Sequence, residues 1–183
     1  KGEWVLIDGP SGKGKSTLFN LLIGLMKPKR GKVLLDGFNI RGFLKSYWKI
    51  IGYIPQTNYL LSETIAWNIT LKKKISVKEK IYLKFLFKIC GLSNIEKRFD
   101  KIFTKKIFTD NVGVSMGQKQ RILLARVLFK KPQILFLDEA LNALDKKSEN
   151  KILSQIKHSF PNLTVLMSTH RPIKAYYDKI IKI

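Results

Sequence analysis

A glycine-rich stretch near the start of the sequence limits the folds open to this chain more than any other feature. It has the spacing G-x-x-x-x-G-K-[ST], and its residues are Gly9, Pro10, Ser11, Gly12, Lys13, Gly14, Lys15, Ser16 and Thr17. The apolar run at residues 4–7 predicts a strand before it, and the apolar stretch at 18–23 predicts a helix after it. In this context such a loop binds phosphate groups. We therefore expect a site for the phosphates of a nucleoside triphosphate.

The chemistry expected of this loop follows from its residue types. Glycines allow the backbone to turn so that successive N–H groups point into one concavity, and the N-terminus of the next helix adds a partial positive charge. Lys15 is expected to lie against the β- and γ-phosphates, and the Ser16 hydroxyl is expected to bind Mg²⁺. Lys13 faces either the phosphates or solvent, and the sequence leaves both open.

Predicted strands and helices alternate along much of the chain, which indicates an α/β fold with a mostly parallel sheet flanked by helices. Residues 134–138 and 164–168 are continuous apolar runs, typical of strands buried on both faces. Shorter strands are expected at residues 32–37, where the strand ends in a turn, at 50–55 and, at the edge of the sheet, at 177–181. With the phosphate loop, this pattern predicts a P-loop NTPase core.

The pattern changes between Gln56 and about residue 111, where helical signals replace strands. A short helix is expected at residues 62–69. A longer helix is expected at 76–90 and should end at Gly91. Apolar residues recur in it every four positions, at Ile81, Phe85 and Ile89. We interpret this section as a helical lobe inserted into the α/β core.

Length, apolar stretches and net charge limit the classes of protein to which the chain can belong. Its 183 residues suffice for one sizeable core, and no uninterrupted apolar stretch reaches the roughly 20 residues that span a membrane. The net charge of +22 could attract nucleic acid or an anionic membrane. Because the lysines are scattered, without interleaved aromatic residues, we favour a codon bias towards lysine over a binding role for this charge.

Two further expectations concern single features. The only cysteine, Cys90, can form no internal disulfide, and we expect it to be buried. The chain begins without methionine and enters its first strand almost at once, so we interpret it as a fragment of a longer protein.

A second group of polar residues follows the ends of predicted strands. Asp138 ends the run at 134–138, and Glu139 comes next. Ligands of open α/β folds bind at the carboxyl ends of the strands, so Asp138 suits a Mg²⁺ contact and Glu139 suits polarising an attacking water. We expect these acids on a strand adjacent to that of the phosphate loop. Gln56 suits a contact with water bound to Mg²⁺, and His170 suits a γ-phosphate contact.

Ser115 precedes a further helical run that extends through Leu128. Gln118 lies three residues after Ser115, which is the spacing of a capping box. A helix start with a small hydroxyl residue and a glycine, here Gly117, also suits an anion. Capping and ligand binding remain alternatives from the residues alone.

These motifs together resemble the nucleotide-binding domain of ABC transporters, and the resemblance covers nearly the whole chain. The segment 115–118 is similar to the signature loop of that family. The elements that carry the resemblance follow in one order: the phosphate loop, Gln56, Ser115 to Gln118, Ile134 to Glu139, Ala143 to Asp145, and His170. The resemblance implies a single ABC ATPase domain at 1–183, with a core at 1–56 and 126–183 and a helical subdomain at about 57–125.

The resemblance also implies the reaction, its cofactors and a partner. ATP would be hydrolysed with Mg²⁺ in a head-to-tail dimer of two such domains, with two ATP molecules at the interface. Glu139 would be the catalytic base, His170 the switch histidine, and Gln56 the residue that senses the metal and couples to a membrane domain. The second domain would cover each ATP with its signature loop, and the residues concerned are Ser115, Gly117, Gln118 and the interface aspartate Asp145.

Finer features resemble the exporter branch of the family. They are the segment 63–69 and the ending Ser168-Thr169-His170-Arg171-Pro172, which is similar to bacteriocin and toxin exporters of the colicin V type. This similarity implies export of a peptide, bacteriocin or protein. It also implies a transmembrane domain N-terminal in the same polypeptide, and a place at the cytoplasmic face of the bacterial cytoplasmic membrane.

Two alternatives remain open. The basic charge allows a soluble ABC-type ATPase that acts on nucleic acid, although nucleic acid is not the expected partner. A degenerate ATP-binding module with weak hydrolysis is the other, because Met116 replaces a glycine of the signature loop and a side chain there could crowd the ATP.

Overall fold

The computed structural model describes residues 1–57, 59–92, 114–170 and 174–183. Arg171 and Pro172, part of the exporter-like ending, lie outside these ranges. By internal contacts, the chain divides into two compact units. Unit 1 consists of Lys1–Gln56, Pro132–Glu139 and Asn162–Ile183, and unit 2 of Thr57–Lys131 and Ala140–Pro161.

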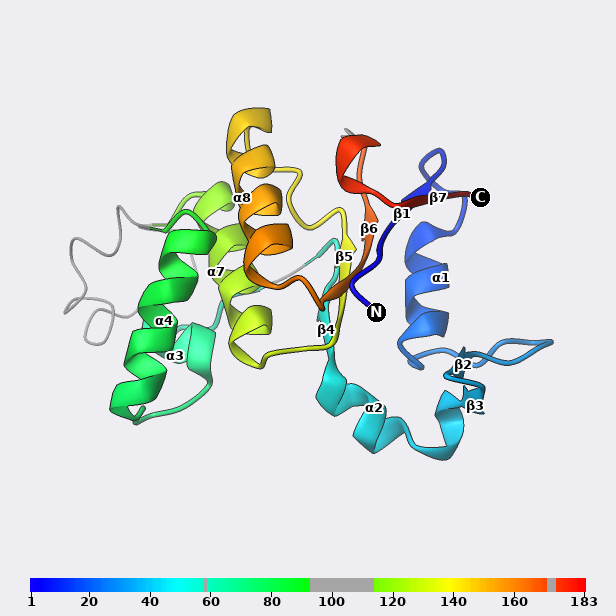
Figure 1. The fold of residues 1–183 in the computed structure, drawn as a ribbon, viewed down its shortest axis with the longest axis horizontal. Helices are drawn as coiled ribbons and strands as arrows, with labels where there is room; N and C mark the ends of the chain where they lie inside the picture. The colour runs from blue at the N-terminus through cyan, green and yellow to red at the C-terminus, as the bar shows by residue number, and fades with distance from the viewer. Residues whose placement is uncertain (58, 93–113, 171–173) are drawn as a thin grey trace. The chain divides into compact units, whose positions relative to one another are not determined.

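Unit 1 contains a five-stranded parallel sheet (Figure 1), which confirms the expected α/β fold. Its strand order is β4-β5-β6-β1-β7, and every pair within it is parallel. The strands are β1 (Trp4–Asp8), β4 (Ile51–Ile54), β5 (Ile134–Asp138), β6 (Thr164–Ser168) and β7 (Lys179–Lys182). The predicted strand at 177–181 is thus confirmed as an edge strand, shifted towards the C-terminus behind a 3₁₀ turn at Lys174–Tyr176.

The predicted strand at 32–37 is wrong in its extent. The chain forms a two-residue strand, β2 (Leu34–Leu35), which pairs antiparallel with β3 (Phe38–Asn39). Asp36 and Gly37 between them both have positive φ, of 50° and 84°. Two consecutive residues of positive φ are typical of a tight hairpin turn, so the turn that the sequence predicted at the end of this strand is confirmed, and it begins at Asp36.

The strand order also corrects the expected position of the acids. They were expected on a strand adjacent to that of the phosphate loop, but β6 lies between β5 and β1. In the register of the sheet, Ser168 pairs with Ile7 on one side and with Asp138 on the other. Because neighbouring strands lie about 4.8 Å apart, the backbone of Asp138 is roughly 10 Å from that of Ile7. All three strands end at the same edge.

One face of the sheet packs against α1 (Lys15–Leu22). Phe19 meets Phe136 of β5 edge to face, with ring centroids 6.0 Å apart, and Val5 and Ile7 of β1 belong to the same cluster. The C-terminal carbonyls of α1 find donors in α2 (Leu44–Ile50): the Tyr47 hydroxyl donates to Leu22 O and the Trp48 indole to Ile23 O. These bonds satisfy groups that a helix end leaves open, so α1 is fixed at the end remote from the loop.

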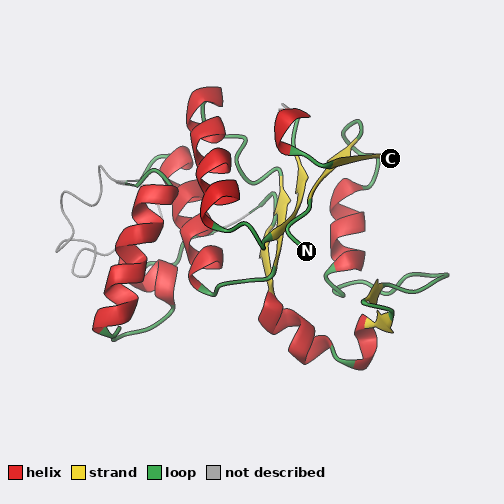
Figure 2. Ribbon diagram, viewed as in Figure 1, coloured by secondary structure: helices red, strands yellow, loops and turns green. Residues whose placement is uncertain are grey.

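Unit 2 is helical in its described part (Figure 2), as the sequence predicted for the middle of the chain. Its helices are α3 (Ile65–Thr70), α4 (Val77–Ile89), α7 (Met116–Phe129) and α8 (Lys146–Ser159). Helix α7 contacts both α3 and α4, and α4 contacts α8. Unit 2 therefore includes residues 126–131 and 140–161, which the sequence analysis assigned to the core; the limits of the domains themselves stay a prediction.

The helix predicted at 76–90 is confirmed as α4, but its apolar stripe is right only at Ile89. Ile81 and Phe85 are exposed, and the other buried positions are Leu83, Leu86, Phe87 and, directly after the helix, Cys90. Residues 83, 86, 87 and 90 follow the i, i+3, i+4, i+7 spacing of a full helix face, whereas a repeat of four drifts off that face. The expectations for Cys90 and Gly91 are confirmed: the thiol is buried, and Gly91 ends the segment with φ +66°.

None of the described helices is long and apolar enough to cross a bilayer.

Candidate nucleotide site

The phosphate loop leads from β1 into α1 through two left-handed glycines. Gly12 and Gly14 have φ of +81° and +90°, and Gly14 is the N-cap of the helix. Such angles are easily reached only without a Cβ atom, which explains why glycine occupies these two positions. The first N–H groups of α1 are therefore presented at the carboxyl edge of the sheet, where the helix N-terminus carries partial positive charge.

Lys15 is buried and Lys13 is exposed. The Lys15 ammonium donates to the carbonyl oxygens of Gly9, at 2.7 Å, and Pro10, at 3.0 Å. The side chain thus folds back over its own loop and holds its charge inside the turn. This position suits an anion bound by the loop. For Lys13, which the sequence left undecided, the structure places the side chain in solvent.

Asp138 ends β5 and is 1% exposed. Its Oδ1 accepts a hydrogen bond of 2.7 Å from the hydroxyl of Ser168, the last residue of β6. The negative charge of Asp138 also acts on Tyr53 of β4: burial first, and this charge second, raise the pKa of the Tyr53 phenol to about 12. A buried carboxylate with one orienting donor lies at the edge where the loop ends.

Glu139 brings together the other residues that the sequence singled out. Its Oε2 accepts a bond of 2.9 Å from the Gln56 amide, and its Oε1 lies 2.9 Å from His170 Nε2. These three residues are 83 and 31 positions apart along the chain, and all belong to unit 1. Glu139 itself has φ +50°, so the chain leaves β5 through a left-handed residue. One carboxylate therefore lies between an amide and an imidazole at the strand ends.

Sequence reasoning missed Ser168 and Tyr53. Ser168 stands two residues before His170 at the end of an apolar run, so its place at the sheet edge was a usable signal. The hydrogen-bond partners of Ser168 could not be predicted from sequence, because they depend on which strand lies beside β6. Tyr53 sits within a short strand and carries no local signal of its nearness to Asp138.

The signature-like segment lies in unit 2 and begins α7. Ser115 and Gln118 form both bonds of a capping box: Ser115 Oγ accepts from Gln118 N at 3.2 Å, and Gln118 Oε1 accepts from Ser115 N at 2.9 Å. The capping alternative is thus confirmed, and ligand binding at these residues stays a prediction. A Cβ on Gly117 would lie 3.1 Å from Leu144 Cδ2, so glycine permits close packing of this turn. The Met116 side chain is exposed.

Asp145 has a structural role of its own as the N-cap of α8. Its Oδ1 accepts from Ser148 N at 2.9 Å. The hydrogen bonds from Ser148 lower the pKa of the Asp145 carboxyl. Asp145 is therefore held ionised at a helix N-terminus, and its expected place at a dimer interface stays a prediction.

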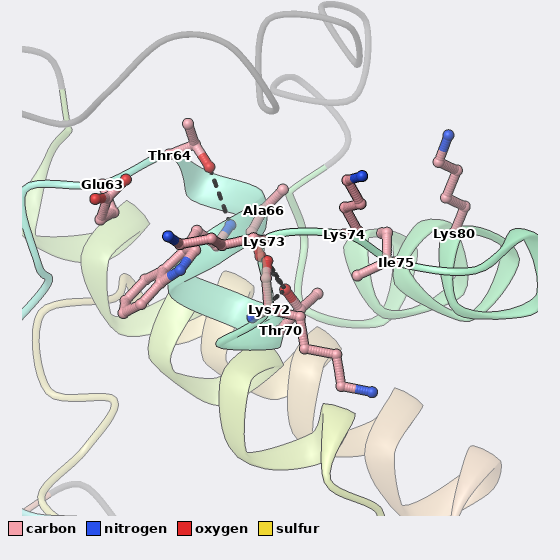
Figure 3. A pocket seen from close by; sticks show the side chains of 10 residues that line it. Glu63, Thr64, Ala66, Thr70, Lys72, Lys73, Lys74, Ile75 and Lys80 are labelled. Carbon is pink, nitrogen blue, oxygen red and sulfur yellow. Dashed lines mark hydrogen bonds between the residues drawn. The ribbon is translucent and has the colours of Figure 1, made fainter.

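A basic pocket lies in unit 2, around α3 and the start of α4 (Figure 3). The pocket has a volume of about 610 Å³. Four lysines are among its lining residues: Lys72, Lys73, Lys74 and Lys80. Lys72 is bonded to Glu79 at 2.5 Å, and in the view of Figure 3 its ammonium extends away from those of Lys74 and Lys80. Because the charges diverge, this pocket lacks the converging donors of the phosphate loop.

The oxygen donors at the sheet edge fit a magnesium ion. Mg²⁺ prefers hydroxyl, carboxylate, phosphate and water oxygens and uses one or two protein carboxylates. Ser16 and Asp138 supply such atoms, and the Gln56 amide offers another. Among the described residues there is no cluster of three or more His, Cys, Asp or Glu side chains suited to a metal. Any cation here would thus depend on phosphate oxygens as well.

A parallel sheet with this loop after its first strand, and with polar side chains at the same edge, defines a P-loop nucleotide-binding protein. The family model described as ABC transporter matches residues 1–142. The chain therefore belongs to the ABC transporter family, and this membership implies that it binds ATP.

Several proteins similar to this chain are named for export or translocation. It is 38% identical over 170 residues to a putative export ATP-binding/permease protein of Rickettsia bellii, covering 92% of this chain and 29% of the relative. It is 36% identical over 174 residues to the alpha-hemolysin translocation ATP-binding protein HlyB of Escherichia coli O157:H7, covering 93% and 24%. A solved bacterial Atm1-family ABC exporter with ATP bound matches with a TM-score of 0.87 and 31% identity, covering 100% and 32%. The chain spans about a third or less of these proteins.

Proposed function

We propose that this chain is the ATP-binding and ATP-hydrolysing domain of an exporter, which powers transport across the cytoplasmic membrane. The observation that carries the proposal is the convergence of Gln56 and His170 on Glu139, at the sheet edge where the phosphate loop ends. The family match and the exporter relatives support it. One relative is named for the translocation of alpha-hemolysin, which supports the narrower prediction of a peptide or protein cargo.

Each candidate site residue of unit 1 has a separate role in the proposed reaction. The N–H groups of the loop and the Lys15 ammonium bind the phosphates, where fixed donors need no reorganisation during reaction. Ser16, Asp138 and Gln56 would hold Mg²⁺, with Gln56 acting through a metal-bound water, and the ion would neutralise phosphate charge. Glu139 accepts the proton of the attacking water, and His170 keeps the Glu139 carboxylate oriented and contacts the γ-phosphate.

The remaining predictions concern partners. We propose a head-to-tail dimer in which Ser115 and Gly117 of a second domain cover the γ-phosphate, with Asp145 at the interface. The fused ATP-binding/permease relatives support a transmembrane domain in the same polypeptide, placed N-terminal to this chain. The domain would then lie at the cytoplasmic face of the membrane.

The test is the variant Glu139→Gln in the intact protein. A positioned base contributes about 10²- to 10⁴-fold, so ATP turnover and transport should fall at least about 100-fold while ATP binding remains. Glu3→Gln, at an exposed glutamate of unit 1, is the matched control and should retain the wild-type rate. Turnover by Glu139→Gln at the normal rate would refute the assignment of the base.

Met116 is the observation that favours a second candidate, a degenerate module with weak hydrolysis. Its side chain is exposed at the start of α7, where glycine would leave room for ATP. If this candidate holds, Met116→Gly increases ATP turnover; an unchanged rate counts against it. The exporter relatives do not favour the nucleic-acid alternative.

A further inference from the structure

Ser168 occupies a central place at the sheet edge, and the proposed function above gives it no task. It is the last residue of β6, is fully buried, and pairs with Ile7 of β1 on one side and Asp138 of β5 on the other. A buried hydroxyl needs hydrogen-bond partners. The partners it has are the two consecutive acids.

The direction of each bond follows from the chemistry of the groups. The Glu139 N–H can only donate, and it lies 3.2 Å from Ser168 Oγ. A hydroxyl has one proton and two lone pairs, and an ionised carboxylate only accepts. The proton of Ser168 is therefore directed at Asp138 Oδ1, at 2.7 Å. One hydroxyl thus accepts from the backbone of one acid and donates to the side chain of the other.

The backbone of Ser168 strengthens the same connection. Its carbonyl oxygen also accepts from Glu139 N, at 3.1 Å, so this N–H is shared between two acceptors of one residue. Glu139 has φ +50°, a conformation that side chains disfavour and that surrounding contacts must maintain. Ser168 supplies such contacts at the point where the chain turns out of β5.

We propose that Ser168 is a positioning residue for magnesium: it fixes the orientation of the Asp138 carboxylate and the turn that carries Glu139. Groups that hydrogen-bond to metal ligands orient them, and their loss typically lowers metal affinity 10- to 100-fold. With Oδ1 engaged by Ser168, the carboxylate cannot rotate freely, and Oδ2 has a fixed direction. This inference rests on the proposed function.

The test measures nucleotide binding as well as turnover in the intact protein. The affinity for a fluorescent ATP analogue is compared with Mg²⁺ and with a chelator, for wild type, Ser168→Ala and Ser168→Thr. Thr164→Val is the matched control, because it removes a hydroxyl from the opposite end of the same strand, where Thr164 accepts from Gly2 N at 3.1 Å. ATP turnover is then followed against Mg²⁺ concentration.

We expect Ser168→Ala to raise the half-saturating Mg²⁺ concentration about 10-fold and to lower kcat, with metal-free nucleotide affinity within about twofold of wild type. Ser168→Thr keeps the hydroxyl and should restore the metal dependence, and Thr164→Val should leave it unchanged. If Ser168→Ala does not fold, Ser168→Cys, whose thiol is a weak donor, takes its place with the same thresholds.

Two results would overturn the inference. One is a wild-type Mg²⁺ dependence in Ser168→Ala; the other is an equal loss of affinity with and without metal, which marks a general structural role. If wild type neither binds the ATP analogue nor cleaves ATP at any Mg²⁺ concentration, the proposed function fails instead. The variants therefore test the role of Ser168, and the wild type tests the proposed function.

Discussion

Replacing Asn68 by alanine should destabilise unit 2 far more than a typical substitution on a short helix. Asn68 is fully buried in α3, and its side chain joins the preceding loop to α7. The amide oxygen accepts from Leu61 N at 2.9 Å and from the Arg126 guanidinium at 2.6 Å. The amide nitrogen donates to three carbonyl oxygens, those of Leu61, Glu63 and Thr64.

The size of the effect follows from the groups that lose a partner. The Leu61 N–H would be left unsatisfied, which costs about 1–3 kcal/mol, and the charge-assisted bond from Arg126 is worth about 1.5–3 kcal/mol. The better helix propensity of alanine offsets about 0.5 kcal/mol of this loss in the free energy of unfolding. The net loss in the free energy of unfolding is therefore about 4 kcal/mol. For a chain of this size, 1 kcal/mol shifts Tm by about 2–4 °C, so Tm should fall by roughly 12 °C.

Thermal unfolding followed by circular dichroism measures this loss. Asn162→Ala is the matched control, because Asn162 is exposed, and its Tm should stay within about 2 °C of wild type. A decrease of less than about 3 °C in Asn68→Ala would show that the hydrogen bonds of Asn68 do not hold the loop to α7. It would also refute the bond-by-bond reasoning used for the magnitude.

Two other predictions concern titratable groups of unit 2. Cys90 is buried, and burial raises the pKa of its thiol. Ellman's reagent should therefore not react with Cys90 in the folded protein and should react fully in denaturant. Rapid modification of the native protein would contradict this prediction. Hydrogen bonds from Lys72 and Ser76 lower the pKa of Glu79 from 4.5 to about 2, so its ionised form stabilises the fold above the unfolded pKa and this contribution is lost as the pH falls towards 2. The stability difference between wild type and Glu79→Gln should be constant from about pH 5 to 7 and shrink below about pH 4.5; a constant difference down to pH 2 would disprove the assignment.

Much of unit 1 was predictable because its strands have strong local signals. Ile134–Asp138 and Thr164–Ser168 match the predicted strands residue for residue, since continuous apolar runs ended by polar residues define a buried strand. The turn at Asp36 and Gly37 was predicted, but the returning strand Phe38–Asn39 was missed, because a strand of two residues has too short a pattern to be recognised in sequence. The stripe of α4 was missed because a fixed repeat of four approximates a helix face over short distances only.

The candidate site was predictable residue by residue, but its connections were not. The loop spacing identified Lys15 and Ser16, and strand ends identified Gln56, Glu139 and His170. That Gln56 and His170 both reach Glu139, and that Ser168 connects the two acids, depends on strand order. Strand order is set by packing across the whole sheet, and short stretches of sequence carry little of it.

The pairing of β1 has a consequence for how the domain is made. Its neighbours in the sheet are β6 and β7, whose residues are synthesised more than 150 positions later. Contacts of such long range close slowly, because a large loop must be ordered first. During translation β1 is synthesised long before β6 and β7, whereas α3 and α4 contact α7, whose residues follow much sooner. Ribosome-bound chains that stop before β6 thus lack the strands that pair with β1 and support the phosphate loop. Bound nucleotide can therefore assist only the last stage of folding.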